Sequence, residues 1–498
     1  MPPNVLVLLV DALRADRVGV FGERNLTPQI DELAADSVVC PNAYTASNAT
    51  DVAVTSLHTG RYPLSHGVVN HGSRVTENEK RTVECVPTLP ELLSADGYHT
   101  ATLGRGLGRW HRNGFDSYRP TQSTPSSAVK HRLGNLLAAF HPSLRETARD
   151  VYETHLSALE KAALGSDSRT DYDESDEPDP LLRTFERLLD KQTPFYAFVH
   201  LNNTHVPYSA DPDLVCSYLD RFDYDVETYE NVVGTSLIPD SFAERAAETR
   251  PELVEQYYVD DGTPSSAVVE AHYDAAVTEA DERVGRLLSQ LRNRDRLDET
   301  LVVLLSDHGE SMTEHGIYFD HHGLYDVSVH IPLIFRPPGG HSATVDDLVQ
   351  ITDIAPTIAS YTDTEGLEPD GRSLKQVIED GTSLEREFVM AEEAHTQRRR
   401  MVRSADHKLI YLVDGDTVCR YCDVEHAPPV ELYDLREDPE EQVNSADEQS
   451  ETVTRLRAYA SRQVTRYRDA RPSCESGSDV IYDDEDVVEK RLEALGYR

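Results

Sequence analysis

The stretch that decides the fold is NVLVLLVD, which runs from Asn4 to Asp11. The apolar run Val5 to Val10 contains no alternating polar residues, as expected for a strand buried on both faces of a parallel sheet. Similar short runs recur between helical patterns: TATLGR (100–105), FYAFVHL (195–201), TLVVLLS (300–306) and PLIFRPP (332–338). This alternation predicts an α/β fold, a doubly wound and mostly parallel sheet flanked by helices.

The sequence pattern changes near residue 385 and predicts a division of the chain. Residues 1–384 are expected to form the α/β domain, with a long helix from about Ser265 to Arg294. Residues 385–498 are expected to form a smaller C-terminal α+β subdomain, with antiparallel strands from EFVMAEE (387–393) onward and a terminal helix in DDEDVVEKRLEALGYR (483–498). The acidic segment at about 166–180, SDSRTDYDESDEPDP, is predicted to be a solvated loop insertion without chemistry.

The charge of the chain limits its partners. The formal net charge is −41, from 89 Asp plus Glu against 48 Lys plus Arg, which suggests a halophilic protein kept soluble in concentrated salt. Such a surface repels nucleic acid and anionic membrane lipid, so neither partner is expected. No apolar run reaches the roughly 18 residues of a transmembrane helix, and the N-terminal stretch lacks the pattern of a signal peptide. We therefore expect a cytoplasmic protein.

The cysteines follow no disulfide-framework spacing, which favours a reducing compartment. They are Cys40, Cys85, Cys216, Cys419, Cys422 and Cys474. The motif CRYC, Cys419 to Cys422, together with His426 offers three possible zinc ligands. Two ordinary thiols in a hairpin are the favoured interpretation, and a structural zinc is the alternative.

Polar residues that end the apolar runs are the candidates for chemistry, because open α/β sheets bind ligands beyond the carboxyl ends of their strands. Asp11 ends the first run, and Asp307 and His308 follow the run at 301–305 in the motif SDHGE. Thr50 precedes a predicted helix in a segment rich in Ser, Thr and Asn. Together these residues would suit a divalent metal such as Mn, Zn or Mg, with Ca less suited because of the imidazole.

Several longer stretches carry a family resemblance. They include NVLVLLVDALRADRVGVFG (4–22), SNATDVAVTSLHTGRYP (47–63), NNTHVPY (202–208), the region that opens with SDHGE (306–310), and ELYDLREDPEEQVN (431–444). In these motifs the chain resembles the sulfatase family of the alkaline phosphatase superfamily. The resemblance implies that Asp11, Asp307 and His308 bind the metal, and that Thr50 is a nucleophile that also contacts the metal.

The same resemblance suggests further catalytic residues. His205 in NNTHVPY resembles a histidine that contacts substrate, although Asn203 stands where the family motif has Asp. His322 in FDHHGLYD resembles a basic residue near the leaving group, and could act as a general acid or bind a second cation. Arg109 and His111 in GRWHRNGFD resemble the GKWH motif, although GRGLGR allows a competing alignment through Arg105. Loop hydrogen bonding or helix capping is the alternative for the two other histidines, His205 and His322.

The departures from the family pattern point to the chemistry. Thr50 stands nine residues before Thr59, where sulfatases carry the Cys or Ser that matures into a catalytic aldehyde, and Ala12 replaces the second Asp of an Asp-Asp pair. A threonine has one hydroxyl and cannot expel sulfate by elimination, whereas water can hydrolyse a phosphothreonine. The sequence therefore predicts a metal-dependent hydrolase of phosphodiesters or phosphomonoesters, with a small-molecule or carbohydrate ester as substrate.

Three alternatives stay open. They are a sulfuric ester hydrolase, a phosphoryl-group transferase and a non-catalytic binding protein. The residues do not predict an oligomeric state.

Overall fold

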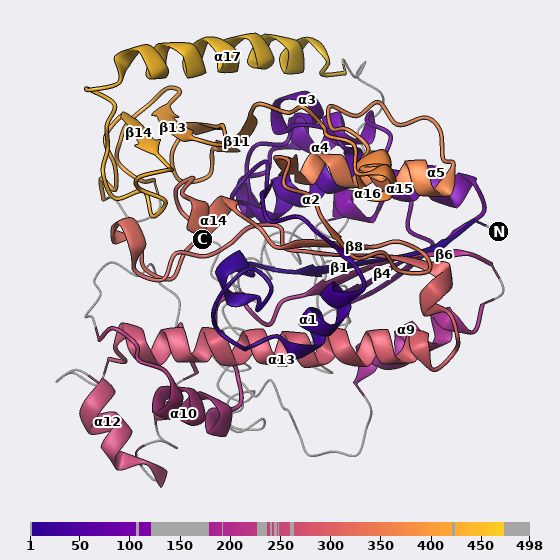
Figure 1. Cartoon of the computed structure of the whole chain (residues 1–498), viewed down its shortest axis with the longest axis horizontal. Coiled ribbons are helices and arrows are strands. Elements are labelled where there is room, and N and C mark those ends of the chain that lie inside the picture. The colour runs from indigo at the N-terminus through magenta and orange to yellow at the C-terminus, as the bar shows by residue number, and fades with distance from the viewer. Residues whose placement is uncertain are drawn as a thin grey trace, which may run out of the picture.

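The computed structural model describes residues 2–105, 109–120, 179–191, 193–226, 237–239, 242–243, 247, 249–258, 263–420 and 424–472. Figure 1 shows a central sheet with helices on both faces and a smaller sheet beside it, crossed by a long helix. The predicted doubly wound α/β fold with an antiparallel C-terminal subdomain is confirmed. The boundary between residues 384 and 385 stays a prediction.

The central sheet has eight strands in the order β5-β4-β6-β1-β7-β8-β2-β9. Its members are β1 (Asn4–Val10), β2 (Val38–Val39), β4 (His99–Gly104), β5 (Ser117–Pro120), β6 (Phe195–Leu201), β7 (Thr300–Leu305), β8 (Leu333–Arg336) and β9 (Ala343–Thr344). Strands β5, β4, β6, β1 and β7 run parallel, and β8 is antiparallel to both β7 and β2. A separate parallel pair joins β3 (Ala43–Tyr44) to β10 (Val349–Gln350). Strand β1 lies between β6 and β7 and so has a strand on either side.

Strand β1 is apolar at every position after Asn4 because it contributes to two cores. Leu6, Leu8 and Val10 pack into the core under α13, whereas the alternate residues Val5, Val7 and Leu9 pack into the core on the opposite face. A strand with successive side chains on opposite faces must be apolar throughout when helices cover both. The run that predicted the fold therefore forms the interior of the sheet.

Helices cover the two faces of the sheet (Figure 1). One face carries α1 (Pro28–Ala35), α9 (Pro180–Leu189), α10 (Pro212–Arg221) and α13 (Ser266–Arg292). The other carries α2 (Thr50–Thr59), α5 (Leu89–Ala95), α15 (Ile354–Thr362) and α16 (Lys375–Asp380). The shorter helices α3 (Pro63–His66), α4 (Glu77–Glu84), α12 (Pro251–Tyr257) and α14 (Asp326–Val329) lie in the connections. The long helix predicted from about Ser265 to Arg294 is α13.

The C-terminal part forms an antiparallel sheet in the order β11-β12-β13-β14. Its strands are Val389–Glu393, Arg399–Arg403, His407–Leu412 and Val430–Asp434, and α17 (Ser450–Asp469) follows them. Buried Lys408 of β13 attaches this sheet to the main domain, because its Nζ lies 2.7 Å from Asp326 Oδ1 of α14. The same Nζ lies 2.7 Å from Glu441 Oε1 within the C-terminal part. The C-terminal sheet is therefore tied by charge to the segment that follows the SDHGE motif.

Two sequence predictions fall partly or wholly outside the described residues. The terminal helix predicted at 483–498 lies outside them, as does the acidic insertion up to residue 178. Asp179, near the end of that insertion, instead caps α9 by accepting a hydrogen bond from Leu181 N at 2.9 Å.

The spacing of the cysteines favoured a reducing compartment, and the structure contains both thiols and a disulfide. Cys40, Cys216 and Cys419 are outside any disulfide, whereas Cys85 is disulfide-bonded. Among the described helices, none combines the length and apolarity that a membrane crossing requires. The cytoplasmic location stays a prediction.

Helix α13 buries an imidazole that the fold keeps uncharged. His272 is 1% exposed, packs edge-on against Phe242 with ring centroids 4.4 Å apart, and has no hydrogen-bond partner among the described residues for either ring nitrogen. Burial lowers the pKa of His272 to about 3. Since the unfolded chain protonates this group near pH 6.5, acidification below that value favours unfolding.

We predict that His272→Leu reduces acid sensitivity. The wild type should lose about 2 kcal/mol of unfolding free energy between pH 7.5 and pH 5 through this histidine, because only the unfolded chain takes up its proton there. The leucine variant should lose correspondingly less, measured by urea unfolding at both pH values. Replacement of the exposed His341 by Leu serves as the control, and an equal pH effect in wild type and His272→Leu would contradict the prediction.

Candidate active site

Four neighbouring parallel strands place polar groups at one edge of the sheet. In spatial order β4, β6, β1 and β7 end in Arg105, His200, Asp11 and Asp307. His200 Nε2 lies 2.9 Å from Asp11 Oδ2, and the Arg105 guanidinium contacts the same oxygen. The predicted cluster at the carboxyl ends of the strands therefore forms, with Arg105 and His200 as additional members.

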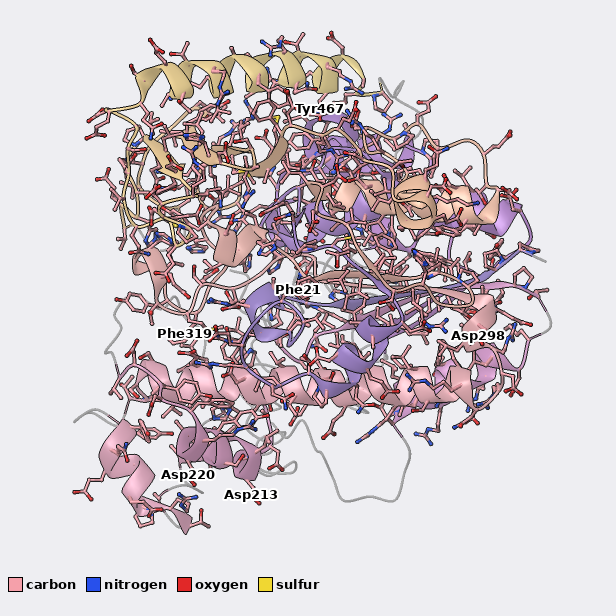
Figure 2. All side chains as sticks on the ribbon, in the orientation of Figure 1. Phe21, Asp213, Asp220, Asp298, Phe319 and Tyr467 are labelled. Carbon is pink, nitrogen blue, oxygen red and sulfur yellow. The ribbon has the colours of Figure 1, made fainter. Side chains whose placement is uncertain are left out.

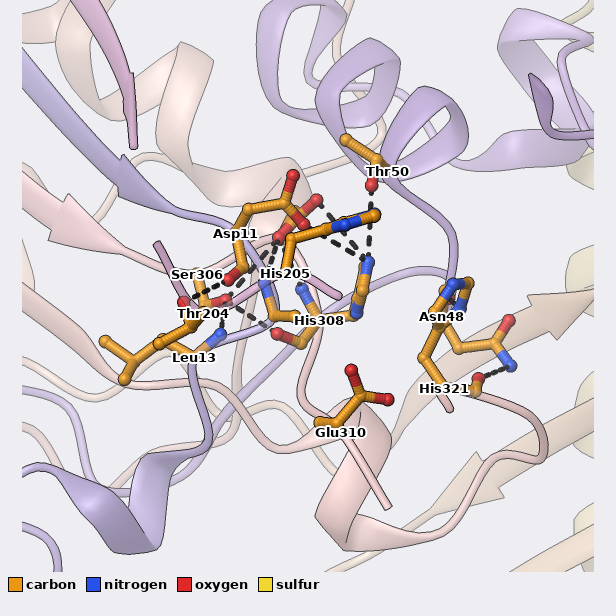
Figure 3. A network of polar contacts seen from close by, with 12 residues as sticks. Asp11, Leu13, Asn48, Thr50, Thr204, His205, Ser306, His308, Glu310 and His321 are labelled. Atoms are coloured by element: carbon orange, nitrogen blue, oxygen red, sulfur yellow. Dashed lines mark hydrogen bonds and ion pairs between the residues drawn. The ribbon is translucent and has the colours of Figure 1, made fainter. Parts of the chain in front are cut away.

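Asp11 and Asp307 each keep one carboxylate oxygen that is buried without a hydrogen-bond partner among the described residues, Asp11 Oδ1 and Asp307 Oδ2. His308 Nε2 lies 3.8 Å from the first oxygen and 3.6 Å from the second, and Thr50 Oγ1 lies 3.3 Å from the same nitrogen. Figure 3 shows Asp11, Thr50 and His308 pointing toward one another from separate segments. Unsatisfied buried carboxylates together with an imidazole and a hydroxyl fit a divalent cation.

The local charge keeps Asp11 ionised. Burial alone would raise the pKa of Asp11, but Arg105, His205 and His200 outweigh burial and hold the pKa well below its ordinary value. An ionised carboxylate is the form that binds a metal. The arginine therefore supports a negative group that the apolar interior would otherwise neutralise.

Two unusual backbone positions bring these side chains together. Gly104 has φ +90°, and a Cβ there would lie 2.1 Å from the carbonyl oxygen of His200, so only glycine lets β4 end close enough to deliver Arg105. Ala12 has φ 57°, and its N–H donates to Asp307 Oδ1 at 3.2 Å while its carbonyl accepts from the Tyr273 hydroxyl at 2.7 Å. The position where the family carries a second Asp is thus a left-handed turn in this chain.

Thr50 is the first residue of α2. The chain just before it is held by hydrogen bonds to the loop that contains His321 and Gly323. Asn48 Nδ2 donates to the carbonyls of His321 and Gly323 at 2.7 and 2.8 Å, and His321 Nδ1 donates to the Asn48 carbonyl at 2.5 Å. The ring of His321 lies 4.4 Å from that of His308. His321, rather than its neighbour His322, therefore forms this wall of the candidate site.

His111 contacts Asp51, the residue that follows Thr50 in the chain. Its Nε2 is 3.2 Å from Asp51 Oδ1, and His71 Nδ1 is 2.9 Å from Asp51 Oδ2. Burial would raise the pKa of Asp51, but the two histidines outweigh it and lower the pKa below its ordinary range. The described contacts of His111 thus support the start of α2.

His205 lies beside Asp11, between Asp11 and Thr50 in the view of Figure 3. Its Nδ1 lies 2.5 Å from the carbonyl oxygen of Val206, which identifies Nδ1 as the protonated nitrogen and leaves Nε2 to face other groups. Burial first and then the charge of Arg105 lower the pKa of His205 to about 3, so the free imidazole is neutral.

The outcome for the two other predicted residues differs. Arg109 belongs to a short 3₁₀ helix, Arg109–Arg112, and its side chain lies outside the described atoms; the described arginine contact with Asp11 comes from Arg105 of the competing alignment. His322 has its Nδ1 3.8 Å from Cys419 Sγ and its Nε2 3.2 Å from Asp320 Oδ2.

Comparison with known proteins identifies the family. The Sulfatase family model matches residues 3–364, most of the chain. The chain belongs to the sulfatase family. A second model, described as N-sulphoglucosamine sulphohydrolase, C-terminal, matches residues 313–468 of this sulfatase-family protein. Members of the family are hydrolases that act on ester bonds and use a divalent metal.

Named relatives of this sulfatase-family chain span nearly its whole length. An arylsulfatase of Clostridium perfringens is 24% identical over 487 residues, covering 92% of this chain and 93% of the relative. The structure of a phosphonate monoester hydrolase of Agrobacterium radiobacter superposes with a TM-score of 0.61 at 21% identity, covering 94% of this chain and 96% of the other. A third structure, in complex with its substrate D-glucosamine-2-N,6-O-disulfate, gives a TM-score of 0.62 at 19% identity over 94% of this chain and 99% of the other.

Sequence reasoning missed His200 and favoured Arg109 over Arg105. Both His200 and Arg105 lie at the ends of the predicted strands FYAFVHL and TATLGR. The rule that selected Asp11, a polar residue closing an apolar run, would also have selected Arg105, and an imidazole next to the last residue of a buried strand is the signal that could have found His200.

We predict that a divalent metal stabilises the protein through the unsatisfied carboxylates. Mn²⁺ at about 100 times its dissociation constant should add about 2.7 kcal/mol to the unfolding free energy of metal-stripped protein, because binding neutralises buried charge. Thermal melts with and without Mn²⁺ would measure this gain.

Asp307→Asn should abolish most of the gain from Mn²⁺, since it removes one of the two carboxylate ligands. Asp298→Asn is the matched control, because Asp298 pairs with Arg336 at the molecular periphery (Figure 2). A Mn²⁺ shift of the same size in Asp307→Asn and Asp298→Asn would rule out this metal site.

Proposed function

We propose that this sulfatase-family hydrolase cleaves phosphate esters, as a phosphodiesterase or phosphomonoesterase, with Thr50 as its nucleophile. The observation that carries the proposal is the position of Thr50 Oγ1, 3.3 Å from His308 Nε2 beside the Asp11 and Asp307 carboxylates. A hydroxyl is the reactive group that the chain offers at this position.

The choice of phosphate follows from what a single hydroxyl can do. The aldehyde hydrate of a formylglycine sulfatase has two hydroxyls, one to attack sulfur and one to expel sulfate by elimination. Thr50 has one, so its ester must be hydrolysed directly. A phosphothreonine permits attack of water at phosphorus, which makes phosphate the substrate group that suits this residue.

We assign the steps to the following groups. A bound divalent cation would lower the pKa of the Thr50 hydroxyl and draw the substrate's nonbridging oxygens toward the site. Thr50 Oγ1 then forms a bond to phosphorus as the bond to the leaving oxygen breaks, and the threonine proton passes to the leaving oxygen through His205. Arg105 would offset charge on the nonbridging oxygens. Water then attacks phosphorus and frees Thr50, returning its proton.

Among the sequence candidates for proton transfer we prefer His205 to His322. The imidazole of His205 lies near enough to Asp11 and His308 for their charges to act on its pKa, whereas the side chain of His322 contacts Cys419 and Asp320. His111 is assigned an indirect role through Asp51, and Arg109 is given no step.

A sulfuric ester hydrolase is the second candidate function. It is favoured by the family itself and by the arylsulfatase relative. The phosphonate monoester hydrolase structure indicates that the same fold also accommodates phosphorus chemistry. Because one structural neighbour holds a sulfated glucosamine as its substrate, a carbohydrate ester is our preferred substrate class.

We predict that hydrolysis depends on Thr50 and prefers phosphorus. Purified wild type in high salt with Mn²⁺ should hydrolyse nitrophenyl phosphate or bis-nitrophenyl phosphate faster than nitrophenyl sulfate. Thr50→Ala should lower kcat by at least about 1,000-fold, since no other hydroxyl replaces it, and Thr50→Ser should keep a measurable fraction.

Thr454→Ala, an exposed threonine of α17, is the control for the Thr50 series. Turnover of sulfate alone, lost in Thr50→Ala, would replace our assignment with sulfuric ester hydrolysis. Full activity in Thr50→Ala would remove the nucleophile.

A further prediction concerns the leaving group. His205→Asn should slow hydrolysis of an alkyl phosphate by about 100-fold, because alkoxide departure needs a proton. Nitrophenyl phosphate, whose leaving group departs as a stable anion, should be slowed much less. His341→Asn is the exposed control, and an equal loss on both substrates would show that His205 is not the proton donor.

A further inference from the structure

A second group of metal-ligand side chains lies outside the Thr50 cluster. His322 comes from the segment after β7, and Cys419 and His426 come from the connection between β13 and β14. One ligand atom from each lies within 4.8 Å of the other two. His322 and Cys419 are buried, and His426 is half-buried. Residues almost 100 positions apart are thus brought to one point by the packing of the C-terminal sheet on the main domain.

The spacing of the ligand atoms fits a tetrahedral zinc ion. With Zn–S near 2.3 Å and Zn–N near 2.0–2.1 Å, a tetrahedral angle puts sulfur and nitrogen about 3.6 Å apart. Cys419 Sγ and His322 Nδ1 are 3.8 Å apart. A direct hydrogen bond from the thiol to the imidazole accounts for this one distance as well, but it does not explain why His426 also approaches both atoms.

The second nitrogen of His322 supplies an independent observation. His322 Nε2 lies 3.2 Å from Asp320 Oδ2, so the ring can donate to a carboxylate while Nδ1 faces the sulfur. His426 in turn hydrogen-bonds the backbone of Gly316. Metal-binding histidines are held in this way, with the second ring nitrogen donating to a carboxylate or a carbonyl oxygen.

We propose that His322, Cys419 and His426 bind a zinc ion that is separate from the catalytic metal. A thiolate and two imidazoles favour zinc, whereas the carboxylates and hydroxyl around Thr50 suit harder cations as well. A water molecule or another donor completes the tetrahedron. Cys422, the other cysteine of the CRYC motif, lies outside the described residues and is no part of this assignment.

The zinc would link the β13–β14 connection of the C-terminal sheet to the active-site loop that contains His321. His322 directly follows His321, whose ring lies 4.4 Å from His308 and whose Nδ1 donates to the carbonyl of Asn48, two residues before Thr50. Gly323 N also donates to Glu393 Oε1 of β11 at 3.3 Å. Zinc bound to Cys419 and His426 would therefore position the loop that supports the nucleophile.

Metal content tests the assignment without using catalysis. Full-length Asp307→Asn protein, in which the catalytic metal is impaired, should retain one zinc per chain after dialysis against zinc-free buffer. Asp307→Asn combined with Cys419→Ser or with His426→Ala should lose that zinc. Asp307→Asn combined with Cys216→Ser is the matched control, because Cys216 is a buried cysteine outside any disulfide and far along the chain from the motif.

A cobalt titration guards against loss of metal through misfolding. Metal-stripped wild type that is loaded with Co²⁺ should show a thiolate-to-cobalt absorption band that Cys419→Ser lacks and Thr50→Ala keeps. Circular dichroism checks that each variant is folded. Absence of the band in wild type, or the same zinc content in the Cys419→Ser, His426→Ala and Cys216→Ser combinations, would overturn the proposal. Absence of ester hydrolysis in the wild type, with the band present, would instead count against the proposed function alone.

Discussion

The constraint on which the site depends is the burial of two carboxylates, Asp11 and Asp307, at the ends of adjacent strands. Their ligand atoms lie within 4.8 Å, and neither side chain is exposed. At such a separation two negative charges repel by about 3 to 4 kcal/mol at an effective dielectric constant near 20. The protein offsets this repulsion with Arg105 and the surrounding histidines, and a cation between the carboxylates would reverse it.

The backbone around the site positions the groups that offset the repulsion between Asp11 and Asp307. Gly104 permits the close approach that delivers Arg105, and the left-handed turn at Ala12 lets its N–H donate to Asp307. The left-handed backbone of Ala12 carries a local conformational cost, which proteins accept mainly where a site needs a fixed geometry. The apolar strand β1 supplies the rigid base, because its packing into two cores leaves Asp11 no alternative position.

The C-terminal subdomain contacts the segment that follows Asp307 and His308. Its strands are joined to α14 through Lys408 and Asp326, and its β13–β14 connection reaches His322. The segment from SDHGE to α14 therefore contacts the carboxylate site at one end and the second sheet at the other. An arrangement of this kind can couple the position of Thr50 to the packing of a subdomain that contains none of the reacting groups.

The sequence by itself determined the strands, the two layers of helices and the carboxylates at strand ends, because apolar runs and the polar residues that close them are local patterns. The tertiary structure alone decided which arginine contacts Asp11, that His200 lies on the same edge, and that His322 lies against Cys419. These depend on the spatial order β4-β6-β1-β7 and on how the second sheet packs, neither of which is encoded in the spacing of residues along the chain. Thr50 could be identified from the sequence as the candidate nucleophile. The positions of Arg105 and His200 near it follow only from the pairing of strands that are distant in the chain.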